Sequence, residues 1–223
     1  METLSQIVLV VGRINSNGQI DMLGTGCLIS NNGKLVTSRH VVSNTDNNLV
    51  VILPKIEHIN EYQDTSDNSC EYVQARIIEL DPIRDIAILQ TNIINTKRIP
   101  MIGSWKIPKI EGFDITYVGD EVYLIGYPHC VEGRKVLTYQ KALIGAKVLL
   151  DSQGIKSKYA VINTQTRPGQ SGSIILSKSK NEIVGILVGA FISGEEISLG
   201  GINPRELHQT THCISAEYIK DMI

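Results

Sequence analysis

Short runs of β-branched and other apolar residues, each closed by turn-forming residues, recur along almost the whole chain. Helical periodicity is scarce, so this pattern predicts an all-β barrel or sandwich. The segment Asn31-Asn32-Gly33 predicts a hairpin turn, because Asn and Gly tolerate a positive φ. The expected strands cover residues 5–14, 21–30, 34–38, 49–53, 72–80 and 85–91, and then 120–127, 136–150, 159–164, 173–177, 183–192 and 211–215.

The expected strands fall into two groups, which predicts two six-stranded antiparallel barrels packed side by side. The segment between the groups carries Pro100 and Pro108, which cannot donate hydrogen bonds to a strand ladder. We therefore expect an N-terminal barrel in residues 1–117, with 92–117 as its linker, and a C-terminal barrel in residues 118–223. The last eight residues have apolar side chains at helical spacing and predict a short helix, with Ser215 as its N-cap.

Composition argues against several classes of function. The formal net charge is −2 and the basic residues are scattered, which disfavours a nucleic-acid-binding surface. The apolar run Ile7–Val11 is too short for a membrane span or a signal sequence, so we expect no membrane association. The cysteines lack CxxC spacing, and without a secretory signal the simplest expectation is reduced thiols in the cytoplasm. They are Cys27, Cys70, Cys130 and Cys213.

Two dipeptides, His129-Cys130 and His212-Cys213, raise the question of a zinc site. Adjacent residues on a strand point to opposite faces, so neither pair would chelate a metal from a regular strand. A site that takes one ligand from each of four elements stays open as an alternative. Our expectation is that the protein uses no metal and no other cofactor.

Three segments contain a histidine, an aspartate and a serine in that order. They are LVTSRHVV around His40, DPIRDIAIL around Asp85 and RPGQSGSII around Ser171. A serine hydroxyl is a poor nucleophile unless a base takes its proton and a carboxylate orients that base. The neighbouring glycines would let the N–H groups of Gly169 and Ser171 turn toward a developing oxyanion.

Each of these residues also has an ordinary explanation when taken alone: a histidine at a strand end, a turn aspartate and a Gly/Ser turn. Their combination favours chemistry. His40 and Asp85 fall in the first expected barrel and Ser171 in the second, so a substrate cleft would lie between the two units. The conjunction predicts a serine peptidase.

The segments resemble those of chymotrypsin-fold serine peptidases, and within that fold the HtrA-like (Deg) branch. The stretch GTGCLISNNGKLVTSRHVV is similar to the histidine motif of that branch, DPIRDIAIL to its aspartate motif, and RPGQSGSIIL to its serine motif. VGDEVYLIGYP (118–128) resembles the opening of its second barrel. The resemblance covers roughly residues 20–220.

This resemblance implies a serine endopeptidase that acts on protein or peptide substrates through an acyl-enzyme. Ser171 would be the nucleophile, and His40 the general base and then the general acid. Asp85 would orient the imidazole, and the backbone N–H groups of Gly169 and Ser171 would form the oxyanion hole.

The chain also departs from the family pattern. Gln170 stands where trypsin-like zymogens carry an aspartate that pairs with a new N-terminus, so activation by that route is not expected. The disulfide that secreted relatives form near the histidine would need a cysteine at Val41 to pair with Cys27. The sequence printed here ends at Ile223 without the PDZ domain common in the HtrA-like branch, so we expect no regulation through such a module.

Substrate preference is weakly encoded. Gln165, rather than an aspartate, occupies the expected base of the S1 pocket, which disfavours Arg or Lys at P1. Leu187 and Ala190 suggest a small or medium apolar P1 residue, whereas His212 would favour Glu or Gln unless it is an ordinary strand histidine. The expected substrate-binding residues are Gln165, Thr166, Leu187, Gly189, Ala190 and His212.

Two alternatives to an active endopeptidase stay open. One is a non-catalytic module that keeps the fold but acts by binding a partner protein, although such a binder has no physical need for a complete triad with its glycines. The other is a latent protease in which the peptide at Gly169 is flipped, so that a carbonyl enters the oxyanion hole until an activating partner protein docks.

Overall fold

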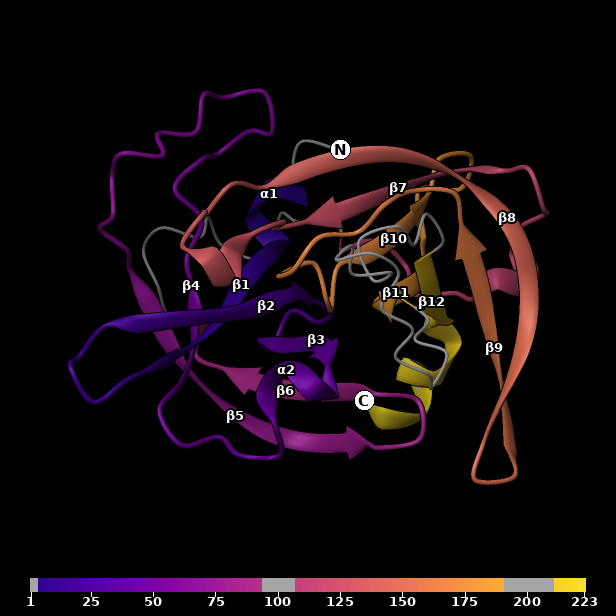
Figure 1. Ribbon diagram of the computed structural model, residues 1–223, viewed down its shortest axis with the longest axis horizontal. Helices are drawn as coiled ribbons and strands as arrows, with labels where there is room; N and C mark the ends of the chain where they lie inside the picture. Colours follow the sequence, from indigo (N-terminus) through magenta and orange to yellow (C-terminus); the bar gives the residue numbers. More distant parts are fainter. Residues whose placement is uncertain (1–3, 94–106, 191–210) are drawn as a thin grey trace, which may run out of the picture.

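The computed structural model describes residues 4–93, 107–190 and 211–223. Its strands form two closed antiparallel barrels of six strands each, which lie side by side (Figure 1). The first barrel has the order β1-β2-β3-β6-β5-β4 and the second the order β10-β11-β12-β9-β8-β7. The expected all-β, two-barrel architecture is therefore confirmed.

The strand bounds follow the sequence pattern closely. The first barrel contains β1 (Val8–Ile14), β2 (Ile20–Leu28), β3 (Lys34–Ser38), β4 (Leu49–Ile52), β5 (Tyr72–Asp81) and β6 (Ile86–Thr91). The second contains β7 (Glu121–Gly126), β8 (Thr138–Ser152), β9 (Ile155–Ile162), β10 (Ile174–Ser177), β11 (Ile183–Ala190) and β12 (Thr211–Ser215).

The helical turns are short and lie directly beside strands or in the segments that connect them. They are the α-helical turns α1 (Leu4–Ile7) and α2 (Arg39–Val42) and the 3₁₀ helices η3 (Phe113–Ile115), η4 (Cys130–Glu132) and η6 (Ala216–Met222). Residues 5–7 were expected to begin the first strand but belong to α1, whose four residues are all buried. In the described part of the chain, no helix has the length and apolarity to cross a bilayer.

The hairpin of β8 and β9 departs most from the sequence expectation, which left residues 151–158 outside any strand. The two strands pair without a break from Leu149↔Lys158 to Ser152↔Ile155, and the hairpin extends beyond the barrel (Figure 1). Gln153 and Gly154 form its turn, with φ of 54° and 80°. The side chains here are exposed or half-buried, apart from that of Ser157, so the sequence carries little apolar alternation to mark the strands.

The apolar core connects the two barrels. Its larger cluster joins first-barrel residues such as Leu9 and Ile88 to second-barrel residues such as Ile125 and Ile174, while a smaller cluster around Phe113 fills the second barrel. Each fully buried Ile or Leu contributes about 1.5–3 kcal/mol, so this shared cluster is a major part of what holds the barrels together.

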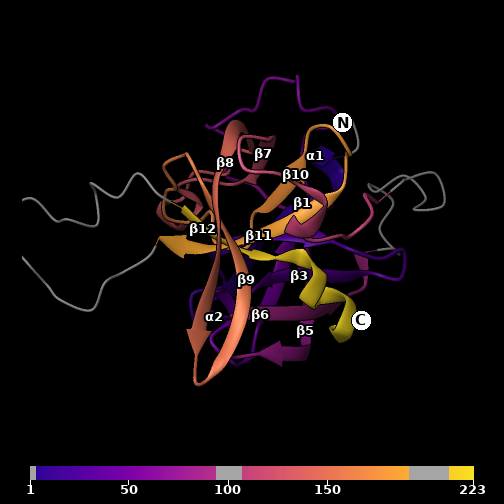
Figure 2. The same ribbon diagram turned by 90° about the vertical axis from the view of Figure 1, so that its right-hand side faces the viewer.

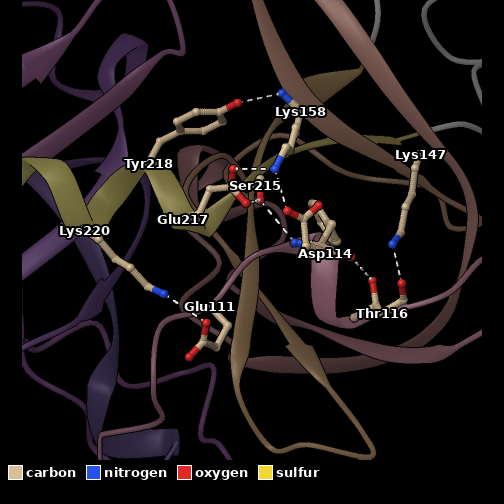
Figure 3. Close-up of polar contacts among 10 residues, drawn as sticks. Glu111, Asp114, Thr116, Lys147, Lys158, Ser215, Glu217, Tyr218 and Lys220 are labelled. Atoms are coloured by element: carbon tan, nitrogen blue, oxygen red, sulfur yellow. Dashed lines mark hydrogen bonds and ion pairs between the residues drawn. The ribbon is translucent and has the colours of Figure 1, made fainter.

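The C-terminal η6 ties the second barrel to the segment that enters it (Figure 3). Ser215 stands at the N-cap position, as expected, but its hydroxyl does not cap the helix. It accepts a hydrogen bond from the N–H of Phe113 (3.1 Å) and donates to Glu217 (3.2 Å). Lys158 forms ion pairs with Asp114 (2.5 Å) and Glu217 (3.0 Å). The serine therefore holds η3 in place instead of capping η6.

Candidate active site

His40 and Asp85 are bound to each other at one edge of the first barrel. His40 lies in α2, directly after β3, and Asp85 directly precedes β6. The Nδ1 atom of His40 is 2.5 Å from Oδ2 of Asp85, and the backbone N–H of His40 donates to Oδ1 at 2.9 Å. An Nδ1–H bonded to the carboxylate leaves Nε2 free to accept a proton, as a general base requires.

A second layer of contacts holds the turn that carries Asp85. The carboxylate of Asp81 accepts hydrogen bonds from the N–H groups of Ile83 (2.9 Å) and Arg84 (3.0 Å) and pairs with the Arg84 guanidinium (2.7 Å). The Arg84 guanidinium in turn stacks 4.3 Å above the ring of Tyr218 in η6. These contacts support the left-handed backbone of Asp85 (φ 58°), which is unfavourable for a residue with a side chain.

The loop that carries Ser171 turns tightly between β9 and β10. Gly169 and Gly172 have φ of 89° and 86°, in the region that favours glycine. A Cβ on Gly169 would lie 2.6 Å from Cys130 Sγ, and a Cβ on Gly172 would overlap the carbonyl oxygen of Thr25. Both glycines are therefore required by conformation and by space.

Each of the four carbonyls of residues 168–171 accepts a hydrogen bond from a residue outside this range. Two of the donors come from β2 of the other barrel, which fixes the loop across the barrel interface. The pairs are His129 N with Pro168 O (2.6 Å), Thr25 Oγ1 with Gly169 O (2.9 Å), Ser173 N with Gln170 O (2.9 Å) and Thr25 N with Ser171 O (2.9 Å).

The backbone N–H groups of residues 169–172 differ in whether they are hydrogen-bonded. The N–H groups of Gln170 and Gly172 donate to backbone carbonyls at 3.1 Å and 2.8 Å. The N–H groups of Gly169 and Ser171 find no acceptor in residues 4–93, 107–190 and 211–223. Because backbone N–H groups are ordinarily paired, two adjacent free donors beside a serine constitute a ready anion-binding site. The Gly169 peptide is not flipped, since the carbonyl of Pro168 faces His129.

Ser171 lies next to the helical turn that carries His40. A Cβ on Gly24 would lie 2.7 Å from Val41, the neighbour of His40, and 3.0 Å from the carbonyl oxygen of Ser171. Ser171 and the turn that carries His40 thus both lie against Gly24, and their joint action with Asp85 stays a prediction. Within the described residues no hydrogen bond joins Ser171 Oγ to His40, and such bonds often tighten only when substrate binds.

The expected substrate-binding residues lie on neighbouring elements. Gly189 of β11 pairs with His212 of β12, and burial lowers the pKa of His212. The side chain of Leu187 is buried in the second-barrel core, while its carbonyl accepts hydrogen bonds from Ser38 Oγ (2.9 Å) and Gly172 N (2.8 Å). Gln165 and Thr166 precede the Ser171 loop; the side chain of Ala190 lies outside the description. Contact between substrate and these six expected residues stays a prediction.

The two His-Cys dipeptides lie apart in the core. Cys130 belongs to the large apolar cluster and Cys213 to the small one, and His129 pairs with Glu132 at 3.0 Å. No group of three His, Cys, Asp or Glu side chains in metal-binding proximity occurs among the described residues.

One residue of the site was missed in the sequence analysis. Thr25 contacts the Ser171 loop through both its backbone and its hydroxyl. The available signal was its position between Gly24 and Gly26, since a polar residue flanked by glycines in an apolar strand indicates a close backbone approach.

Comparison with known proteins agrees with this geometry. Residues 24–186 match the family model of the trypsin-like peptidase domain. The chain is 25% identical over 175 residues to the serine endoprotease DegS of Haemophilus influenzae, covering 78% of this chain and 44% of that protein. It is 25% identical over 164 residues to a probable periplasmic DegP-like serine endoprotease of Pseudomonas putida, covering 74% and 28%. The chain therefore spans less than half the length of these relatives.

Solved structures share the fold. The active form of the Rv3671c protease from M. tuberculosis superposes with a TM-score of 0.66 at 19% identity, covering 98% of this chain and 80% of that one. The HtrA-type protease AlgW with a decapeptide gives a TM-score of 0.67 at 16% identity, covering 100% and 66%. Because the family model spans well over half of the sequence, the chain belongs to the trypsin-like peptidase domain family; it has the two-barrel chymotrypsin-like fold and is similar to HtrA-type proteases.

Proposed function

We propose that the protein is a serine endopeptidase that hydrolyses peptide bonds through an acyl-enzyme on Ser171. The observation that carries this proposal is the pair of backbone N–H groups on Gly169 and Ser171 that have no acceptor among the described residues, together with the His40–Asp85 pair. A protein that only binds a partner has no need for two free amides beside a serine.

In the acylation step, Nε2 of His40 takes the proton of Ser171 Oγ as that oxygen bonds to the scissile carbonyl carbon. The carbonyl oxygen becomes negative and receives the N–H groups of Gly169 and Ser171, each worth roughly 3–4 kcal/mol in comparable sites. His40 then gives the proton to the leaving amine as the C–N bond breaks. A water molecule then attacks the acyl-enzyme ester while His40 takes its proton. His40 returns that proton to Ser171 Oγ as the ester bond breaks, and the second product is released.

Asp85 holds the imidazole in the tautomer with hydrogen on Nδ1 and stabilises its positive charge during both steps. The direction of the Pro168 carbonyl, toward His129, supports a hole that is formed without an activating partner. The substrate class is protein or peptide. The apolar and the Glu/Gln preferences at P1 both stay open.

The test is labelling with a fluorophosphonate probe, read by intact mass. We expect one adduct on the wild-type protein, none on Ser171→Ala, and one on Ser152→Ala, whose serine lies on the distant β8–β9 hairpin. Unaided cleavage of casein by the wild type would support activity without a partner. A wild type that takes up no probe would favour the latent or partner-binding alternative.

We also propose that the protein acts in a reducing compartment such as the cytoplasm, away from nucleic acid and membranes. All four cysteines are free thiols, and three of them are buried. Fractionation of the source cells would test the location, and recovery of the protein outside the cytoplasm would contradict it.

A further inference from the structure

Thr25 links the two barrels at the candidate oxyanion hole. It lies in β2, is fully buried, and its hydroxyl contacts two second-barrel segments. The N–H of Tyr127 donates to Thr25 Oγ1 at 3.0 Å, and Oγ1 lies 2.9 Å from the carbonyl oxygen of Gly169. A hydroxyl has a single proton, so with Tyr127 as donor that proton is left for Gly169.

Gly169 joins two peptide planes, and Thr25 holds one of them by its carbonyl. The peptide plane before Gly169 contains the Gly169 N–H, which would bind the oxyanion. This plane is held by the hydrogen bond from the N–H of His129 to Pro168 O. The plane after it carries the Gly169 carbonyl, which accepts a hydrogen bond from the Thr25 hydroxyl and has a weaker contact with Cys130 Sγ at 3.6 Å. The same plane carries the N–H of Gln170, which donates to Arg167 O at 3.1 Å. With both planes held, φ and ψ of Gly169 are fixed despite the wide freedom of glycine.

The backbone of Thr25 also contacts the residue that carries the second donor. Its N–H donates to the carbonyl oxygen of Ser171 at 2.9 Å, which orients the peptide that follows the nucleophile. We propose that Thr25 is a positioning residue that sets the oxyanion hole of the second barrel from the first barrel. This inference rests on the proposed peptidase function.

The flanking residues explain why a small hydroxyl residue can reach this place. A Cβ on Gly24 would lie 3.0 Å from Ser171 O, and a Cβ on Gly26 would overlap the side chain of Leu35. The absence of a side chain at Gly24 lets β2 approach the Ser171 loop closely enough for direct hydrogen bonds, while Gly26 makes room for Leu35 within the first barrel. Serine at position 25 could replace the hydroxyl, whereas valine would keep the shape and lose both contacts.

The experiment measures the inactivation rate constant and the apparent dissociation constant for a fluorophosphonate probe. We expect Thr25→Val to lower the rate constant by about tenfold, with the dissociation constant within about twofold, because the hole acts on the transition state. Thr25→Ser should recover most of the rate. The pH midpoint of labelling should not move, because the substitution leaves the His40–Asp85 pair in place. Thr91→Val removes an equally buried hydroxyl, which donates to Gly33 O at 2.9 Å far from the loop, and should label like the wild type.

Thermal unfolding of each variant is measured alongside, and if Thr25→Val does not fold, Thr25→Ala takes its place. The inference is overturned if a folded variant without the hydroxyl labels as fast as the wild type, or if Thr25→Ser is as slow as Thr25→Val. It is also overturned if Thr91→Val is slowed equally. A wild type without any adduct would overturn the peptidase function itself, and the role of Thr25 with it.

Discussion

Gln170 supports the nucleophile loop without a charge. Its side chain is buried; its Oε1 accepts a hydrogen bond from the N–H of Arg167 (2.7 Å), and its Nε2 donates to Oε1 of Gln140 (2.7 Å). A neutral amide can be buried at modest cost when it is hydrogen-bonded, whereas a carboxylate here would need a counter-ion. The loop is thus held by an internal amide contact where trypsin-like zymogens use an ion pair with a new N-terminus.

Gln170→Glu tests this arrangement. The substitution keeps the shape, but its carboxylate would face Oε1 of Gln140, so we expect a loss of about 2–3 kcal/mol in the free energy of unfolding at pH 7. Burial would raise the pKa of the new carboxyl in the folded state, so the loss should shrink as the pH falls toward 4. Urea unfolding at several pH values measures it. Gln153→Glu, on the exposed hairpin turn, should leave stability unchanged at every pH.

A comparison of Gly172 with Gly133 distinguishes the cost of steric crowding from the cost of backbone strain. Both have a positive φ, of 86° and 90°, but a Cβ on Gly172 would overlap Thr25 O whereas a Cβ on Gly133 would meet nothing within 4 Å. We expect Gly133→Ala to cost about 1 kcal/mol and Gly172→Ala at least about 3 kcal/mol, measured by urea unfolding. Equal costs would show that strain alone, and not the contact between the barrels, makes glycine necessary.

Among the elements, the turn between β5 and β6 connects the candidate base to the C-terminus. Figure 2 shows η6 beside the strands of the first barrel, and Arg84 makes the contact by stacking on Tyr218. Burial opposes ionisation of Asp81, but its hydrogen bonds with Arg84 outweigh burial and lower its pKa. The same ion pair orients the turn that presents Asp85.

Arg84→Gln should therefore destabilise the protein by about 1 kcal/mol at pH 7, through loss of the ion pair and of the stacking on Tyr218. Because the pKa of Asp81 is lowered in the folded wild type, the ion-pair part of this stability is present above the ordinary value of 3.8 and is lost as the pH falls through the folded-state pKa. The difference between the two proteins, followed by thermal unfolding, should narrow below pH 4. A difference that grows in acid would contradict the assignment.

The elements also show which features a sequence can reveal. Strands such as β6 were predictable because their apolar side chains are buried. The candidate residues His40, Asp85 and Ser171 could be singled out because each lies in or beside a local pattern of glycine or turn residues, and their catalytic roles stay predictions. The β8–β9 hairpin was not, since its ladder is held by backbone hydrogen bonds with little burial. The role of Thr25 depends on contacts with residues more than 100 positions away, which no local pattern encodes.

At the scale of the whole molecule, the two barrels behave as one unit. One apolar cluster contains residues of both, and hydrogen bonds cross from Thr25 to the Ser171 loop, from Ser38 Oγ to Leu187 O (2.9 Å) and from Tyr127 OH to Val8 O (3.2 Å). The candidate site lies on this shared interface, so separation of the barrels would destroy it.

We therefore expect a single cooperative unfolding transition. Far-UV circular dichroism, near-UV circular dichroism and the loss of fluorophosphonate labelling should share one urea midpoint. Two separated midpoints, with labelling lost at the first, would mean that one barrel stays folded without the other and that the interface contributes less than the shared core indicates.

The burial of the thiols has a practical consequence for spectroscopy. Burial raises the pKa of Cys130 to about 12 and also raises the pKa values of Cys27 and Cys213, so these thiols stay protonated and enclosed at neutral pH. Cys70 is half-buried and lines the pocket beside Lys135. A maleimide dye added to the native protein should thus attach once, at Cys70, as peptide mapping would verify. The natural sequence then already provides a single-site fluorescent reporter, placed on the first barrel where it meets the second.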